Sequence, residues 1–168
     1  MTEYKIDTYQ KVFLKILNFV SYKPRTEKEI SDRLARYLGS EKISVEEKEE
    51  LNEKILFQLK EDGYVDDKKT AKQYLNSYLG SQRPGSISRF KQALKKKGFK
   101  ETEISDLTSN ISAEQEEIKA LNEAKKRLTR LKNETGFIKK AKLTNFLYSK
   151  GYSANTIKSV VDTLLPLQ

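Results

Sequence analysis

Three copies of one short pattern constrain the fold more than any other feature of this 168-residue sequence. Each copy reads Leu-x-x-x-Gly-aromatic: LKEDGY begins at Leu59, LKKKGF at Leu94 and LYSKGY at Leu147. When the glycine lies just past a helix end in the left-handed conformation, the leucine occupies the third-last helical position and packs against the aromatic residue. The pattern therefore predicts three helix ends, and LARYLG from Leu34 predicts a fourth at Gly39.

Helix starts are marked by capping boxes, in which a Ser or Thr and a Glu or Gln three residues later satisfy backbone amides at the helix N-terminus. The spacing occurs in three pairs: Thr26 with Glu29, Ser44 with Glu47, and Ser112 with Gln115. Asp66 and Asp67 follow one predicted helix end and can cap the next helix. Between these marks apolar residues recur every three or four positions, and no stretch alternates at period two. We therefore expect an all-α fold.

The signals together predict about nine helices, which group in threes. Their expected ranges are 8–21, 26–38, 44–62, 67–79, 86–97, 102–111, 113–133, 138–150 and 154–165. Because the middle helices of the groups align on one leucine each, we expect three tandem three-helix modules, at residues 1–65, 66–111 and 112–168. A module of about fifty residues buries only a small core, so each should contact its neighbour in an elongated, curved array.

The residue types available exclude most catalytic chemistry. The chain has no Cys and no His, which rules out disulfides, Cys/His zinc sites, Cys nucleophiles and His bases. Neighbouring acids such as Asp66 and Asp67 diverge by about a hundred degrees on a helix and do not converge on one metal ion. The seven glycines fall at predicted helix ends, so no Gly-rich loop cradles a phosphate. We expect neither an enzyme nor a cofactor.

No segment reads as a membrane span or a targeting sequence. Residues 1–18 carry acids and lysines instead of an uninterrupted apolar core, and no window approaches about 18 consecutive apolar residues. These features, together with the absence of Cys, predict a cytoplasmic protein.

The charge of the chain is unevenly distributed. The formal net charge is +9, and residues 68–100 contain ten Lys or Arg and no Asp or Glu. Within the helix expected at 86–97, Phe90 and Leu94 form an apolar stripe, while Arg89 and Lys96 point away from it. Residues 119–142 hold nine bases and two acids and form a second basic patch. A positive face favours an anionic partner, although such faces also serve only to solubilise a protein.

At this point the sequence resembles the RecX family, whose members regulate RecA recombinase filaments. Three segments carry the resemblance: KPRTEKEISDRLARYL at 23–38, LKEDGYVDDKKTAKQY at 59–74 and RPGSISRFKQALKKKGF at 83–99. Their order and spacing agree across residues 20–110, and 113–165 is similar to the family's third module. Thr70 stands where the family usually has Phe, and Pro precedes Gly in RPG, where Gly-Pro is commoner.

The resemblance implies a non-enzymatic regulator of recombination and the SOS response. Family members lie in the groove of the RecA–single-stranded DNA filament and hinder ATP hydrolysis and strand exchange. The partners implied are the RecA filament and, without sequence preference, single- or double-stranded DNA, and we expect a monomer. The expected RecA- or DNA-binding residues are Arg25, Lys68, Lys69, Lys72, Arg83, Arg89, Lys95, Lys96, Lys97, Lys100, Lys119, Lys126 and Arg130.

Two other functions fit the residues less closely. PRTEKEISDRLARYL could begin a helix-turn-helix of a transcriptional regulator, but the helix expected at 44–62 is acidic and lacks the Arg, Asn and Gln that read base edges. The chain could also be a scaffold whose positive charge has no partner.

Overall fold

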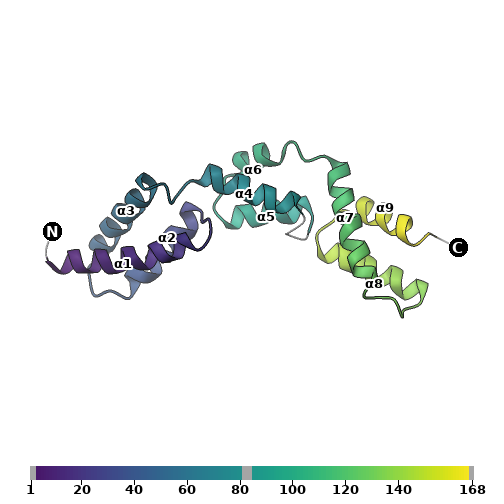
Figure 1. The fold of residues 1–168 in the computed structure, drawn as a ribbon, viewed down its shortest axis with the longest axis horizontal. Helices are drawn as coiled ribbons and strands as arrows, with labels where there is room; N and C mark the ends of the chain where they lie inside the picture. The colour runs from purple at the N-terminus through teal and green to yellow at the C-terminus, as the bar shows by residue number, and fades with distance from the viewer. Residues whose placement is uncertain (1–2, 81–84, 167–168) are drawn as a thin grey trace. The chain divides into compact units, whose positions relative to one another are not determined.

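The computed structural model describes residues 3–80 and 85–166, and all regular structure within these ranges is helical (Figure 1). The all-α fold class is therefore confirmed. In the described part of the chain there are nine helices: α1 Glu3–Ser21, α2 Glu27–Gly39, α3 Val45–Glu61, α4 Asp67–Leu79, α5 Ile87–Lys96, α6 Glu101–Thr108, α7 Ala113–Leu128, α8 Gly136–Ser149 and α9 Ala154–Leu164.

The capping signals in the sequence correspond to real helix starts. The Thr26, Ser44 and Ser112 side chains each accept from the backbone N–H three residues later, and all three capping boxes are complete. Asp66 caps α4 by accepting from the Lys69 N–H at 2.8 Å. Asp67 instead accepts from the N–H of Glu27 at 2.9 Å, so it joins the start of α4 to the start of α2.

The three Leu-x-x-x-Gly-aromatic segments end helices as predicted. Gly63, Gly98 and Gly151 have φ of 74°, 96° and 83°. The N–H of the following aromatic residue donates to the leucine carbonyl in each case, at 2.9, 3.3 and 3.3 Å, which is the Schellman pattern. The helix end predicted at Gly39 is also confirmed, because this glycine is the last residue of α2. Its geometry differs from the other three ends: the αR residue Ser40 caps the helix, in place of a left-handed glycine.

Two helix boundaries differ clearly from the predicted ones. α1 begins at Glu3 rather than at 8. α7 ends at Leu128 rather than at 133, because the Thr129 hydroxyl donates to the Lys126 carbonyl at 2.9 Å and the chain then turns to bury Leu131. The apolar period continued across this turn, so periodicity alone placed the end too late.

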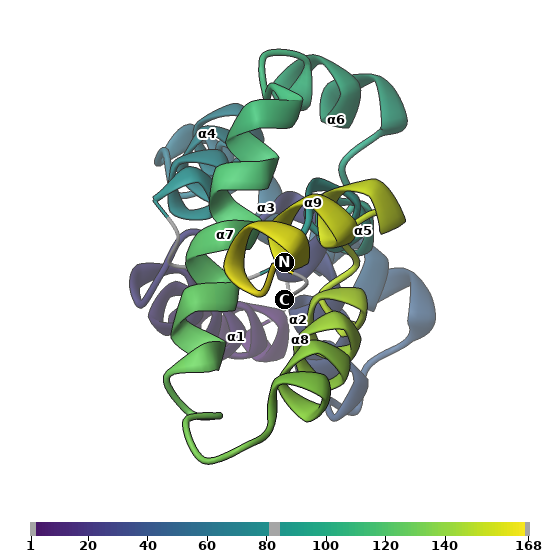
Figure 2. The same cartoon turned by 90° about the vertical axis from the view of Figure 1, so that its right-hand side faces the viewer.

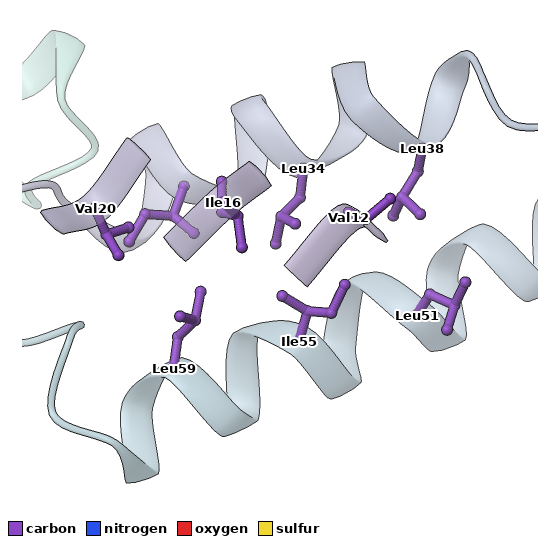
Figure 3. Close-up of a cluster of buried hydrophobic side chains, with 9 residues drawn as sticks. Val12, Ile16, Val20, Leu34, Leu38, Leu51, Ile55 and Leu59 are labelled. Atoms are coloured by element: carbon purple, nitrogen blue, oxygen red, sulfur yellow. The ribbon is translucent and has the colours of Figure 1, made fainter. Parts of the chain in front are cut away.

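The chain divides into two compact units, residues 1–73 and 74–168, and the division falls inside α4. The predicted module boundaries at 65/66 and 111/112 remain a prediction. In the first unit, α1, α2 and α3 enclose one aliphatic core, shown in Figure 3. Its nine buried residues are Val12, Ile16, Val20, Ile30, Leu34, Leu38, Leu51, Ile55 and Leu59. Burying each such side chain contributes about 1.5–3 kcal/mol, so this core stabilises the unit.

The second unit contains two groups of buried residues. Aromatic pairs join the end of α4 to α5 and the α5–α6 turn: Tyr78 stacks on Phe90 with centroids 4.5 Å apart, and Tyr74 meets Phe99 edge-on at 6.5 Å. Helices α7, α8 and α9 contact one another around a second core (Figure 2). Its buried members are Ala120, Ala124, Leu143, Leu147, Tyr152, Ile157, Val160 and Val161.

Candidate anion-binding surfaces

The cations expected near the start of α4 lie at the surface of the first unit. Lys68, Lys69 and Lys72 are exposed, and none of them forms an ion pair within residues 3–80. Their charge is therefore open to an anionic partner. Arg25, by contrast, is largely used inside the fold: its side chain is 14% exposed, lies 3.9 Å from the Phe19 ring centroid and is 3.8 Å from a Glu29 carboxylate oxygen. Arg25 stabilises the entry to α2.

The cations of α5 belong to the second unit and differ in what they contact. Arg89 donates from Nη1 to the Ser149 carbonyl at 2.7 Å, which satisfies the end of α8. Lys95 pairs with Glu101 at 3.1 Å, so the positive face is partly neutralised by α6. The Lys97 ammonium lies 4.8 Å from the centroid of the Tyr74 ring. Lys96 and Lys100 are exposed, while Arg83 lies outside the described residues. The acid-free stretch thus contributes cations to both units.

Lys119 does not lie on the outer face, and the expectation that it joins Lys126 and Arg130 there was wrong. It is 6% exposed, its ammonium donates to the Tyr78 carbonyl at 2.6 Å, and it lies 4.3 Å from the Tyr78 ring centroid. Burial lowers the pKa of Lys119. The reason is non-local: the face of α7 that carries Lys119 packs against the end of α4.

Lys126 and Arg130 do come together, in a groove between α7 and α8. This α7–α8 groove has a volume of about 310 Å³ and is lined by Asn122, Glu123, Lys126, Arg127, Arg130, Phe146 and Lys150. Arg127 and Lys150 lie 5.6 and 5.4 Å from the centroid of Phe146, so the ring positions both charges beside the groove. The groove therefore gathers four cations, two of which lie beside one aromatic ring.

None of the four groove cations forms an ion pair with a described residue, whereas lysines elsewhere in this unit do. Lys95, Lys140 and Lys142 each have a carboxylate partner. The Nε of Arg127 is also buried without a hydrogen-bond partner among the described residues. Such a donor is costly unless something external satisfies it. The arrangement suits an anionic ligand.

Sequence reasoning missed Arg127 and Lys150. Arg127 follows Lys126 directly in the run KKR and belongs to the basic patch of residues 119–142, but this run alone does not show that Arg127 faces the groove. Lys150 was read only as part of the helix-ending segment LYSKGY. A helical-wheel projection of the helix predicted at 113–133 places 123, 126, 127 and 130 on one side, and this is the signal in the sequence that could have identified Arg127. The contribution of α8 depends on tertiary packing.

The single acid of the groove, Glu123, is engaged on its inner side. One carboxylate oxygen accepts from the Gly85 N–H at 2.7 Å and from the Tyr152 hydroxyl at 2.8 Å. The neighbouring Glu116 accepts from the Ile87 N–H at 2.9 Å, and the Ser86 N–H donates to the Lys150 carbonyl at 3.0 Å. We call these contacts the α5–α7 junction. They hold the start of α5 against α7 and the end of α8.

The junction is dry enough to perturb its tyrosines. Burial, followed by the charges of Glu116 and Glu123, raises the pKa of Tyr78 well above its ordinary value. Burial and the hydrogen bond to Glu123 raise the pKa of Tyr152 in the same direction. Both tyrosine side chains are therefore neutral at physiological pH.

Other kinds of site find no support in the described residues. They contain no group of three or more His, Cys, Asp or Glu side chains that could hold a metal ion. Among the helices of residues 3–80 and 85–166, none is both long and apolar enough to cross a bilayer. The chemistry that the surface offers is attraction of anions.

The fold and these surfaces define a class: an all-α protein in a tandem three-helix array with cations on its surface. Known proteins of this kind match the chain. Residues 114–161 match the family model described as RecX, third three-helix domain. A regulatory protein RecX of Clostridium perfringens (strain 13) is 33% identical over 162 residues, which cover 95% of this chain and 71% of the relative. The RecX of Clostridioides difficile (strain 630) is 30% identical over 159 residues, 95% and 70% of the two chains.

The chain therefore belongs to the RecX family. It spans 57% of the length of the Limosilactobacillus reuteri regulatory protein RecX, to which it is 26% identical. Two solved structures share the fold. A crystal structure of regulatory protein RecX has a TM-score of 0.68 and 25% identity, covering 94% of this chain and 73% of the other. The crystal structure of RecX from Lactobacillus salivarius has a TM-score of 0.66 and 23% identity, covering 95% and 97%.

Proposed function

We propose that this chain is a cytoplasmic, non-enzymatic regulator that binds RecA–single-stranded DNA filaments and inhibits their ATPase, recombination and SOS-related activities. The observation that carries the proposal is membership of the RecX family, at 33% identity to a regulatory protein RecX over 95% of the chain. The relatives' name denotes a regulator, and the chain's net charge of +9 suits a polyanionic partner.

The displayed cations supply a physical basis for filament binding. Exposed lysines without an ion pair occur at the start of α4, and a cation-lined groove lies between α7 and α8. Each such contact is weak in water, but contacts linked in one chain add through effective concentration when the partner is a polymer of repeated subunits. Binding of this kind depends strongly on salt and little on base sequence.

The helix-turn-helix alternative is disfavoured by α3. This helix follows α2, where a recognition helix would lie, yet it contains six glutamates and three lysines. Its Glu49, Glu50 and Glu53 are exposed and would face phosphates with like charge. A helix entering the major groove needs donors for base edges and an overall positive face.

An ATPase assay of RecA on single-stranded DNA tests the proposal. Adding the chain at near-stoichiometric ratios should lower ATP turnover, because bound regulator hinders the filament. The variant Lys68→Glu with Lys72→Glu should inhibit less. The matched control is Lys15→Glu with Lys42→Glu, two exposed lysines of the same unit outside residues 68–100. Unchanged turnover with the unmodified chain, across a wide range of ratios, would refute the function.

A further inference from the structure

The strongest site on the molecule that the family assignment does not explain is the α7–α8 groove. It combines a concave surface, an aromatic ring in contact with two of its cations and a buried donor without a hydrogen-bond partner among the described residues. At about 310 Å³ it reaches the lower end of the size range of ligand-binding clefts. The groove is therefore large enough to receive a phosphate group with its attached sugar.

We propose that the α7–α8 groove binds the phosphodiester backbone of single-stranded nucleic acid, independently of base sequence. The inference rests on the proposed function, because the single strand that the groove would contact is the one inside the RecA filament. The residues that bind phosphate are Lys126, Arg127, Arg130 and Lys150.

Electrostatics favour an anion of high charge density. The groove presents four positive charges against the single carboxylate of Glu123. That carboxylate already accepts two hydrogen bonds from Gly85 and Tyr152, which directs one of its oxygens into the α5–α7 junction. Arg127 and Arg130 add guanidinium groups, whose fork of donors matches two phosphate oxygens at once. A phosphate would also satisfy the Arg127 donor that is otherwise unpaired.

The lining argues for nucleic acid rather than an acidic protein surface. Tight protein contacts centre on an apolar or aromatic anchor that enters a pocket. Phe146, the aromatic residue that lines this groove, is partly buried and already in contact with two cations. The large exposed aromatic residues of α8 lie elsewhere, Phe137 at 85% and Tyr148 at 76% exposure, and neither lines the groove. A sugar–phosphate chain needs no such anchor.

The test measures binding of a fluorescein-labelled oligothymidylate by fluorescence anisotropy, without recombinase. The groove variant is Lys126→Glu with Arg130→Glu, and both side chains are exposed. The matched control is Lys125→Glu with Lys132→Glu, which makes the same charge change at exposed neighbours that do not line the groove. Circular dichroism of all proteins checks that helicity is kept.

We expect the groove variant to bind at least about tenfold more weakly than the control. Its plot of log affinity against log salt concentration should be shallower by about 1.4, since each lost phosphate contact on a single strand contributes about 0.7. Arg127→Lys, which keeps the charge but loses the fork, should weaken binding by a smaller factor, about threefold. Lys158→Arg on α9, outside the groove, should change nothing.

Several outcomes would overturn the inference. Equal losses in the groove variant and its control would show that only the overall charge matters. Unchanged oligonucleotide binding in the groove variant, with weaker binding to RecA alone, would assign the groove to an acidic protein surface. The proposed function fails separately: if the chain binds oligothymidylate through the groove but leaves RecA turnover unchanged, the site stands and the regulatory role does not.

Discussion

The helix groups α1–α3 and α7–α9 have the same number of helices and similar ends, yet their cores differ. The first is closed by nine aliphatic side chains, with no buried charge among them. The second contains two alanines and a tyrosine, and it adjoins Lys119, Glu116 and Glu123. The aliphatic core of the first group is filled by side chains of α1, α2 and α3. In the second group, the glutamates of α7 also bond to the start of α5, and a groove lies between α7 and α8. The candidate site therefore lies in the helix group whose core adjoins charged side chains, not in the group with the aliphatic core.

Two copies of the Leu-x-x-x-Gly-aromatic pattern, one in each group, show the difference most clearly. Gly63 and Gly151 both follow a leucine by four residues and both adopt a left-handed conformation. The aromatic residue after Gly63, Tyr64, is 44% exposed, whereas Tyr152 after Gly151 is 3% exposed and bonded to Glu123. The Leu-x-x-x-Gly-aromatic pattern thus ends α3 in the first group. In the second group it ends α8, and its aromatic residue also takes part in the α5–α7 junction.

The largest expected effect tests whether the two cores are separate. Leu34 and Leu147 are both fully buried, one in each core. Replacing either by Ala should cost about 3–5 kcal/mol, from lost burial and the cavity left behind. Hydrogen-exchange mass spectrometry should show that Leu34→Ala lowers protection within residues 1–73 and that Leu147→Ala lowers it within 74–168. If either variant loosens both ranges equally, the cores are energetically coupled and the comparison fails.

The next effect separates the two glycines. At Gly63 an added Cβ would meet nothing within 4 Å, so Gly63→Ala should cost only the left-handed strain, about 1 kcal/mol. At Gly151 the Cβ would lie 2.9 Å from the Ser86 hydroxyl oxygen, which caps α5. Gly151→Ala should therefore cost about 2–3 kcal/mol, because strain and a weakened cap add.

Urea unfolding followed by far-UV circular dichroism measures both costs. Gly39→Ala serves as the control, since that position is not left-handed, has space for a Cβ and should be neutral or slightly stabilising. Equal costs at Gly63 and Gly151 would mean that the contact between the end of α8 and Ser86 contributes nothing.

The sequence predicted what is decided within a few residues. The capping box of Ser44 and Glu47 and the glycine end at Gly98 depend on hydrogen bonds between near neighbours, so their residue types suffice. The helix end at Gly39 was also predicted correctly, but a glycine at a helix end does not itself require a left-handed conformation, and Ser40 closes that helix in αR geometry.

The candidate site was predicted only in part because it depends on contacts distant in sequence. Lys126 and Arg130 are four residues apart, which places them on one face of the helix predicted at 113–133; in the structure Arg130 follows the end of α7 and still lines the groove. Lys119 belongs to the same run of bases, but whether it faces water depends on the end of α4, 41 residues earlier in the chain. Lys150 reaches the groove from α8. A helical period shows which residues share a face, but not what packs on it.

The smallest effect concerns one hydroxyl group. Tyr152→Phe keeps the ring and removes the donor to Glu123, which should cost about 1 kcal/mol at pH 7. Tyr64→Phe, at the aromatic position of the same pattern after α3, should change stability very little because that side chain is exposed. Urea unfolding of the two variants in parallel measures the difference.

Raising the pH sharpens this last comparison. Burial and the bond to Glu123 raise the pKa of Tyr152 above its ordinary value of about 10, so the unfolded chain loses this proton before the folded one. The stability that the hydroxyl contributes is complete below pH 10 and is lost as the pH rises beyond it. The deficit of Tyr152→Phe should therefore shrink between pH 9 and pH 11. Lys119, whose pKa is lowered, acts in the opposite direction but equally in both proteins, so it cancels from the difference. A deficit that stays constant over this range would show that Tyr152 titrates alike in both states and that the junction is open to water.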